Sequence, residues 1–222
     1  MSKKQHNDEP IVLDEALGKS EAFVLKYKNS IMAAIVAIVV IVVGYIAYTK
    51  YISEPYEQEA KEAMYIAEQV FAAKDFEQAL NGDSLNTFMG FVQVAEEYSG
   101  TEAGNLANAY AGISLAQLGR YEEAISYLED FDADDRMIAP AVKGTLGQCY
   151  ANVGRPADAV ECFVDAAEIA DNNTLSSIYL REAGIVSESM VKNTDALKYY
   201  ERIKNDYPLS MPDVDKYIER VK

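Results

Sequence analysis

Three aspartates at alternating positions are the part of this sequence that most resembles a set of metal ligands. Asp130, Asp132 and Asp134 have the spacing of the first ligands in a calcium-binding loop. The motif fails further along, because Asp135 replaces the required glycine and Ala141 replaces the bidentate glutamate. The pattern therefore favours a solvated turn between helices over a calcium site.

The other side chains with redox or metal-binding chemistry are two cysteines and one histidine. Cys149 and Cys162 are close enough in sequence for a disulfide, although a free cysteine commonly behaves as a small buried apolar residue. Neither cysteine has metal-ligand spacing with a histidine, since His6 lies in a polar N-terminal tail. The position of this single histidine also excludes most catalytic triads.

Acidic pairs such as Glu96-Glu97 and Glu122-Glu123 do not suggest catalysis either. Adjacent positions of a helix point in different directions, so these carboxylates are expected to face solvent separately. The sequence contains no glycine-rich phosphate loop, nucleophile elbow or zinc-binding helix motif. We therefore expect a protein that is not an enzyme and has no catalytic residues, cofactor or metal.

The charge of the chain is strongly negative and unevenly distributed. Acidic and basic residues balance over residues 1–49, so the net charge of −16 belongs to residues 50–222. Such a surface repels phosphate backbones and anionic lipid head groups, which argues against nucleic-acid binding and peripheral membrane binding. Its partners should be neutral, basic or apolar.

An uncharged segment of 21 residues lies between Lys28 and Lys50. At a helical rise of about 1.5 Å per residue it would span about 30 Å of hydrocarbon. Residues 29–49 are therefore predicted to be a single transmembrane helix, preceded by a short leader at residues 1–28. A cleaved signal peptide is the competing interpretation. It is disfavoured because the leader and the apolar segment are both long, and because no cleavage site of the small-x-small type follows Tyr48.

Lysines near the predicted span indicate its orientation. They are slightly more numerous on its N-terminal side, with Lys19, Lys26 and Lys28 before the span and Lys50 and Lys61 after it. Positive residues favour the cytoplasmic side, so the N-terminus is expected in the cytoplasm. The large acidic part, residues 50–222, would then be exported.

The stretch from Pro140 to Asn173 has the pattern of two helices folded into a hairpin. Each half places small and large side chains on one helical face: Leu146, Gly147 and Tyr150, then Ala159, Phe163 and Ala166. The small residues let two helix axes approach closely, while the large ones fill the flanks. Gly154 supplies a permissive backbone between the two helices.

The same pattern recurs on both sides of this hairpin. Gly119 and Gly154 are 35 residues apart, and corresponding residues occur at Gly112, Ala124 and Leu128 upstream, at Gly184, Ala196 and Tyr200 downstream, and more weakly at Ala67, Phe76 and Ala79. The pattern L-G-x-x-Y followed by A-x-x-x-F-x-x-A, with a period of about 34 residues, resembles the tetratricopeptide repeat.

This resemblance implies an all-α fold, with the transmembrane helix followed by a tetratricopeptide-repeat α-solenoid of helical hairpins over residues 50–222. Repeats are expected at about residues 60–80, 105–138, 140–173 and 177–210, with an extra helix at about 85–98. The sequence Ser53-Glu54-Pro55 predicts the start of the first helix of the domain.

Stacked helical hairpins offer a concave groove lined by the first helix of each pair. By spacing within the repeat, the predicted groove residues are Ala109, Ile113, Gln117, Gly144, Gln148, Asn152, Arg181 and Ile185. Such a groove suits an extended segment or an apolar helix of a partner. The repeats that clamp the carboxylate tail of cytosolic chaperones are not matched, because Ala109 and Ile113 occupy the places of that clamp's Lys and Asn.

The order of leader, membrane helix and acidic repeat domain resembles the ancillary subunit of the bacterial SecYEG translocon. This resemblance implies a single-pass inner (cell) membrane protein with its C-terminal domain in the periplasm. Its expected partners are translocon subunits, a periplasmic chaperone and exported polypeptides. An adaptor for envelope assembly or cell division, unrelated to the translocon, is the alternative.

Overall fold

The computed structural model describes residues 11–83, 85, 87–132 and 136–222. Every secondary-structure element in those ranges is a helix, which confirms the predicted all-α fold. The chain forms two compact units, Met1–Pro55 and Tyr56–Lys222. Each unit is described separately below.

The first unit contains α1 (Ile11–Tyr48) and the π-helical turn η1 (Thr49–Ser53). Within the described chain, the helical stretch Leu25–Ala72 holds an apolar window long enough to cross a membrane, and none of that window is buried. A core helix of a soluble protein would be covered by other elements. The exposed window is therefore that of a membrane anchor or a signal sequence. Helix α2 begins at Glu54, where the sequence predicts a helix start, but Ser53 is the last residue of η1 and therefore does not cap a free helix end.

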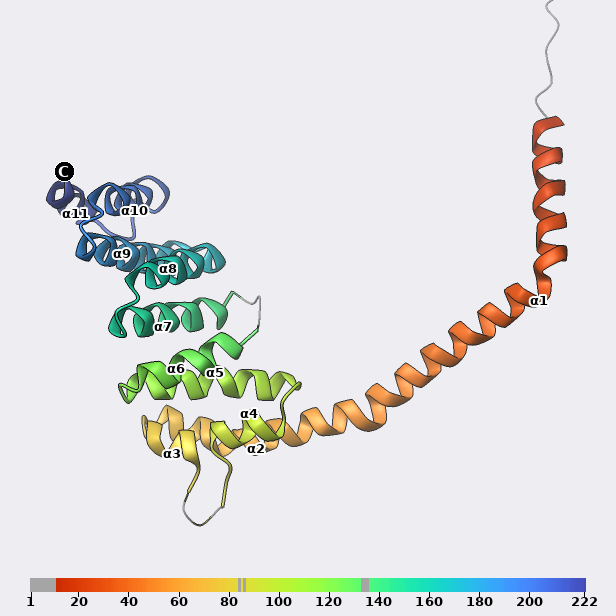
Figure 1. Cartoon of the computed structure of the whole chain (residues 1–222), viewed down its shortest axis with the longest axis horizontal. Helices are drawn as coiled ribbons and strands as arrows, with labels where there is room; N and C mark the ends of the chain where they lie inside the picture. The colour runs from red at the N-terminus through yellow and green to blue at the C-terminus, as the bar shows by residue number, and fades with distance from the viewer. Residues whose placement is uncertain (1–10, 84, 86, 133–135) are drawn as a thin grey trace, which may run out of the picture. The chain divides into compact units, whose positions relative to one another are not determined.

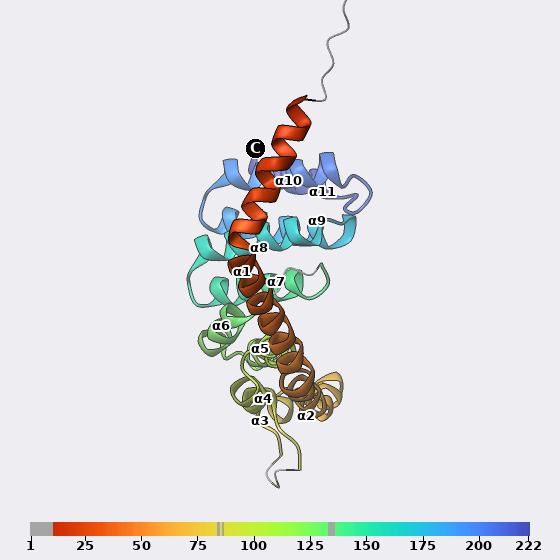
Figure 2. The ribbon, with the colours of Figure 1, turned by 90° about the vertical axis from the view of Figure 1, so that its right-hand side faces the viewer.

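The second unit is a stack of helices that follow one another in chain order (Figures 1 and 2). Consecutive helices pack together as antiparallel pairs, α5 with α6, α7 with α8 and α9 with α10. The helices are α2 (Glu54–Ala72), α3 (Phe76–Asn81), α4 (Phe91–Glu97), α5 (Glu102–Gln117), α6 (Tyr121–Asp130), α7 (Ala139–Asn152), α8 (Pro156–Ala170), α9 (Asn173–Ser189), α10 (Asn193–Asp206) and α11 (Val214–Val221).

Helix α4 begins six residues later than the start expected at about residue 85. The preceding segment is shaped by Gly82, which has φ +79°, and by Gly90, whose added Cβ would lie 2.3 Å from the backbone nitrogen of Gly82. The two glycine backbones therefore touch, and no larger residue fits there. Helix α4 starts at Phe91, directly after this contact.

One kind of turn joins the two helices of each hairpin. Its central residue has positive φ, and the two N–H groups at the turn donate to carbonyls three and five residues earlier, which is a Schellman motif. Gly119 and Gly154 fill this position in two hairpins, as the sequence suggested, while Lys74 (φ 65°) and Val191 (φ 60°) fill it in the other two. A β-branched side chain such as that of Val191 is strained in this conformation.

Replacing Val191 by glycine should stabilise the protein. The side chain is 85% exposed, so little packing is lost, and relief of the left-handed backbone is worth about 1 kcal/mol. Thermal unfolding of the full chain measures the effect. Gly154→Ala is the matched control and should cost about 1 kcal/mol, because its Cβ meets no atom within 4 Å and only the backbone is strained. A lower unfolding midpoint for Val191→Gly would contradict this account.

A glycine on the first helix faces a large side chain on the second helix in three successive hairpins. Cβ atoms added at Gly112, Gly147 and Gly184 would lie 2.5, 3.0 and 2.4 Å from Leu128, Phe163 and Tyr200, respectively. The glycines therefore set the distance between paired helices. In the first hairpin, Ala67 occupies the position of these glycines. No large side chain of α3 faces it in the same way, because α3 ends at Asn81, before the position that corresponds to Phe163.

The C-terminal end of the stack is closed by α11. Its apolar side chains Val214, Ile218 and Val221 are buried. On its other side, Arg220 donates two hydrogen bonds to the carboxylate of Glu188, at 2.7 and 2.9 Å, and Tyr200 donates a third. The last helix thereby covers the final hairpin and presents charged residues to water, as a terminal cap requires.

The Glu188 contacts predict a pH-dependent contribution to stability. Partial burial acts to raise the pKa of Glu188, but hydrogen bonds from Arg220 and Tyr200 and the Arg220 charge hold this pKa below its usual value. A carboxyl group whose pKa is lower in the folded state stabilises the fold above its unfolded pKa, and this contribution disappears as the pH falls through the folded pKa. Glu188→Gln should therefore cost about 1 kcal/mol at neutral pH.

The cost of Glu188→Gln should shrink in acid, since wild-type Glu188 is then protonated as well. Urea unfolding of both proteins between neutral pH and pH ~3 measures the difference, because an unperturbed Glu titrates near pH ~4.3. Glu219→Gln on the exposed face of α11 is the control. A stability difference that stays constant with pH would contradict the proposed linkage.

Candidate protein-binding groove

The predicted groove residues lie on three first helices of the hairpins, α5, α7 and α9. Four of them are exposed and two are half-buried, while the remaining two lie in the interior. The exposed residues are Gln117, Gln148, Asn152 and Ile185. The half-buried residues are Ile113 and Arg181, and the interior residues are Ala109 and Gly144.

Ala109 and Gly144 cannot contact a partner through side chains of their own. Ala109 is only 1% exposed. A Cβ at Gly144 would lie 2.3 Å from the Tyr179 ring, so this tyrosine of α9 covers Gly144 of α7. The expectation for these two residues is corrected: Ala109 belongs to the core and Gly144 lies beneath the Tyr179 ring. Tyr179 was missed, because spacing within one repeat does not reveal contacts between repeats.

The exposed part of α7 carries two amide side chains. The Asn152 amide donates a hydrogen bond to the backbone carbonyl of Gln148 at 2.8 Å, which fixes its orientation and leaves its oxygen as an acceptor. Among the described residues, no hydrogen bond is made by the side chain of Gln148. Both amides can therefore bind polar backbone groups of a partner.

Helix α9 adds apolar surface with little net charge. Ile178 and Ile185 are 37% and 39% exposed and lie on the same helical face as Arg181. The Arg181 guanidinium pairs with the adjacent Glu182 carboxylate at 2.6 Å, so its charge is largely neutralised. The hydrogen bond to Glu182 raises the pKa of Arg181 further, and the group stays protonated at all physiological pH values. This face is therefore partly apolar, and its one cation is paired.

The two cysteines lie on the adjacent helices α7 and α8. Both are buried and free, so the disulfide that the sequence left open is not formed. Burial raises the pKa of each thiol to about 11. Because the thiolate is the reactive form, neither cysteine is suited to nucleophilic or redox chemistry at neutral pH.

Among the aspartates that resemble a calcium loop, Asp130 is the last residue of α6 and Asp132 follows it, while Asp134 and Asp135 fall outside the described residues. Asn105 of α5 binds the backbone of Asp132 in both directions, donating at 2.7 Å and accepting at 2.9 Å. Across the described ranges, no three Asp, Glu, His or Cys side chains are grouped so that they could hold a metal ion. The described part of this segment is thus tied to α5, the first helix of its own hairpin.

Comparison with known proteins identifies the central hairpin. Residues 141–173 match the tetratricopeptide repeat family, and they contain nearly all of α7, the whole of α8 and the first residue of α9. No curated protein matches the chain. The second unit is thus a helical repeat region that contains a tetratricopeptide repeat at residues 141–173.

Proposed function

We propose that this protein is a non-enzymatic scaffold, anchored in a membrane by α1, whose repeat domain binds other proteins. The tetratricopeptide repeat at residues 141–173 is the observation that carries this proposal, because such repeats serve as protein-interaction modules. The exposed apolar window in the helical stretch from Leu25 supports the anchor. Retention of this helix, instead of its removal as a signal sequence, is part of the proposal.

The repeat domain would bind partners through the first helices of its hairpins. The exposed Ile178 and Ile185 supply apolar contact area, and Gln148 and Asn152 supply hydrogen-bonding groups. Ile113, Gln117 and Arg181 complete the surface. A neutral or apolar segment suits this face, since the only cation among the proposed residues is already paired with Glu182.

We further propose that the protein is an accessory subunit of the SecYEG translocon in the inner membrane, with a cytoplasmic N-terminus and a periplasmic repeat domain. The support is the order of a lysine-containing leader, an apolar helix and an acidic repeat region. Its partners would be channel subunits, exported polypeptides and a periplasmic chaperone. Tethering to the membrane raises the effective concentration of the domain beside a membrane-embedded channel, so that weak groove contacts suffice.

Crosslinking in intact membranes tests this proposal. A photoreactive amino acid placed between Lys50 and Glu62 should capture translocon subunits, which are then identified by mass spectrometry. The same amino acid at Asp215 in the last helix is the positional control. Capture of cell-wall or division proteins instead would favour an envelope-assembly adaptor and contradict the translocon assignment.

The groove itself is tested by a pair of variants in the same assay. Ile185→Asp places a charge on the proposed apolar surface and should lower the recovery of partners from mild detergent severalfold. Glu161→Lys on the exposed side of α8 is the control and should leave recovery unchanged. Equal recovery from both variants would place the binding surface elsewhere.

A further inference from the structure

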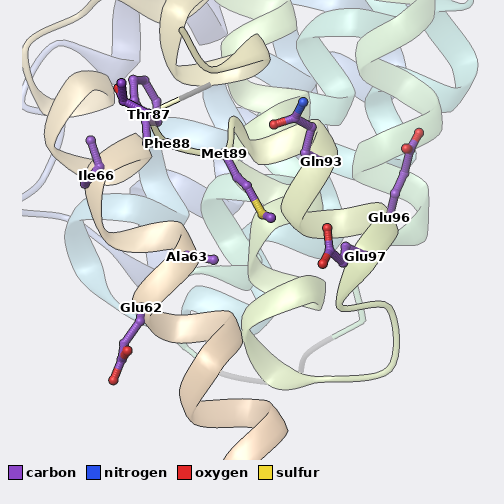
Figure 3. Close-up of a pocket in the computed structure, with 9 residues that line it drawn as sticks. All are labelled: Glu62, Ala63, Ile66, Thr87, Phe88, Met89, Gln93, Glu96 and Glu97. Atoms are coloured by element: carbon purple, nitrogen blue, oxygen red, sulfur yellow. The ribbon is translucent and has the colours of Figure 1, made fainter. Parts of the chain in front are cut away.

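A second concave surface lies at the N-terminal end of the repeat domain, away from the proposed groove residues. A cavity of about 740 Å³ opens between α2 and α4. Figure 3 shows the side chain of Met89 lying between the two helices. The cavity is lined by Glu62, Ala63 and Ile66 of α2, by Thr87, Phe88 and Met89, and by Gln93, Glu96 and Glu97 of α4.

The floor and one wall of this cavity are apolar. Ala63, Phe88 and Met89 are half-buried, and Ile66 is 44% exposed. Tyr65, the neighbour of Ile66 on α2, is 60% exposed. Within the repeat unit, Tyr56–Lys222, the C-terminal end is closed by the amphipathic helix α11, whereas these side chains at its N-terminal end stay half-buried or exposed. This apolar surface is therefore available to a partner.

The rim of the cavity is acidic. Glu62, Glu96 and Glu97 all line it, and neither Lys nor Arg is among the lining residues. In the part of the chain that the structure describes, none of these three carboxylates forms an ion pair. Acidic groups elsewhere in the domain are often paired, as Glu123 is with Arg120 and Asp158 with Arg155. The uncompensated negative charge favours a cationic partner.

The walls of the cavity are fixed in position by contacts behind it. The carboxylate of Glu57 on α2 accepts hydrogen bonds from the backbone N–H groups of Glu102 and Ala103, at 2.8 and 3.1 Å, at the start of α5. The hydroxyl of Tyr56 donates to the carbonyl of Glu97 at the end of α4. A cavity held in this way exists before the partner arrives, which lowers the conformational cost of binding.

We propose that this acidic cavity binds a cationic amphipathic helix of a partner protein, with its apolar side chains on Met89 and Ile66 and its Lys or Arg residues facing Glu62, Glu96 and Glu97. An extended segment fits less well, because the backbone groups of α2 and α4 are hydrogen-bonded within the helices and the N–H groups of Thr87 and Phe88 already donate to Asp83. An anionic lipid surface is repelled by the rim. This inference concerns a different surface from that of the proposed function and goes beyond it.

A synthetic helix-forming peptide with leucines on one face and lysines on the other is the probe. Binding is measured by fluorescence anisotropy on the full chain in phosphatidylcholine nanodiscs, with empty nanodiscs as background. The variant Glu62→Lys/Glu96→Lys/Glu97→Lys should weaken binding at least tenfold. The matched variant Glu122→Lys/Glu201→Lys/Glu219→Lys changes the net charge equally at exposed sites outside the cavity and should bind nearly as the wild type does.

Two further measurements locate the peptide. A photoreactive leucine on its apolar face should form adducts at Met89 or Ile66, and a peptide with glutamates in place of the lysines should not bind. Equal weakening by the two triple variants would reveal general attraction to an acidic protein and overturn the proposal. So would absence of binding to the wild type, equal binding of the glutamate peptide, or adducts confined to α7 and α9.

Because all six substituted glutamates are exposed, both triple variants should fold, and circular dichroism checks this directly. Loss of peptide binding with unchanged helicity assigns the effect to the cavity. The peptide-binding test and the groove crosslinking test can fail separately, because Ile185→Asp should leave binding of the peptide intact.

Discussion

Arginine substituted for both Val39 and Val42 is expected to release the protein from membranes. Both valines lie near the centre of the apolar segment and are exposed on α1. An arginine at the centre of a membrane-spanning helix costs about 3 kcal/mol, so the pair costs about 6 kcal/mol. The measurement is the fraction of protein that stays in the membrane pellet after an alkaline carbonate wash.

Val39→Leu/Val42→Leu is the control for this experiment and should remain in the pellet, because leucine keeps the segment apolar. The mass of the mature wild-type protein should also include residues 1–49. Extraction of the wild type by carbonate, or loss of the N-terminal segment from the mature chain, would contradict a retained anchor and favour a signal sequence.

Gly147→Leu is expected to destabilise the repeat domain by about 2 kcal/mol. This net value is the cost of overpacking minus the roughly 1 kcal/mol that is gained when a glycine is removed from a helix. The reason is contact with the Phe163 ring, which lies 3.0 Å from the position of a Cβ at Gly147 and is only 2% exposed. Further atoms at this site must push α7 and α8 apart. Thermal unfolding followed by circular dichroism should show a midpoint lower by about 4–8 °C.

Two alanine variants separate helix propensity from overpacking. In Gly147→Ala the tight Cβ contact and the gain in helix propensity nearly cancel, so stability should change by less than about 1 kcal/mol. Gly184→Ala should cost more, since its Cβ would lie 2.4 Å from the buried Tyr200 ring. An unchanged midpoint for Gly147→Leu would count against the close crossing of α7 and α8.

The arrangement of the hairpins was predictable because it depends on local patterns. Gly147 and Phe163 recur one period later as Gly184 and Tyr200, and both pairs are in contact. The turn at Val191 was not predictable from its residue, because a valine disfavours positive φ and only the surrounding hairpin imposes it. Tertiary packing outweighs local preference at that position.

The exposure of the proposed groove residues was predictable only in part. Spacing within a repeat places Gln148, Asn152 and Ile185 at exposed positions, as found. It does not reveal contacts between repeats, so the covering of Gly144 by Tyr179 was missed. The cavity between α2 and α4 depends on the late start of α4, which follows from the Gly82–Gly90 contact and has no periodic signature.

We propose that the first helices of the hairpins bind a polypeptide partner while α1 holds the protein in a membrane. A photoreactive amino acid at Gln148 in intact membranes tests it most directly, with Glu161 on the exposed side of α8 as the comparison site. We expect protein adducts from Gln148 that are lost in the Ile185→Asp variant, and few adducts from Glu161. Adducts from Glu161 alone, or Gln148 adducts that persist in Ile185→Asp, would contradict it.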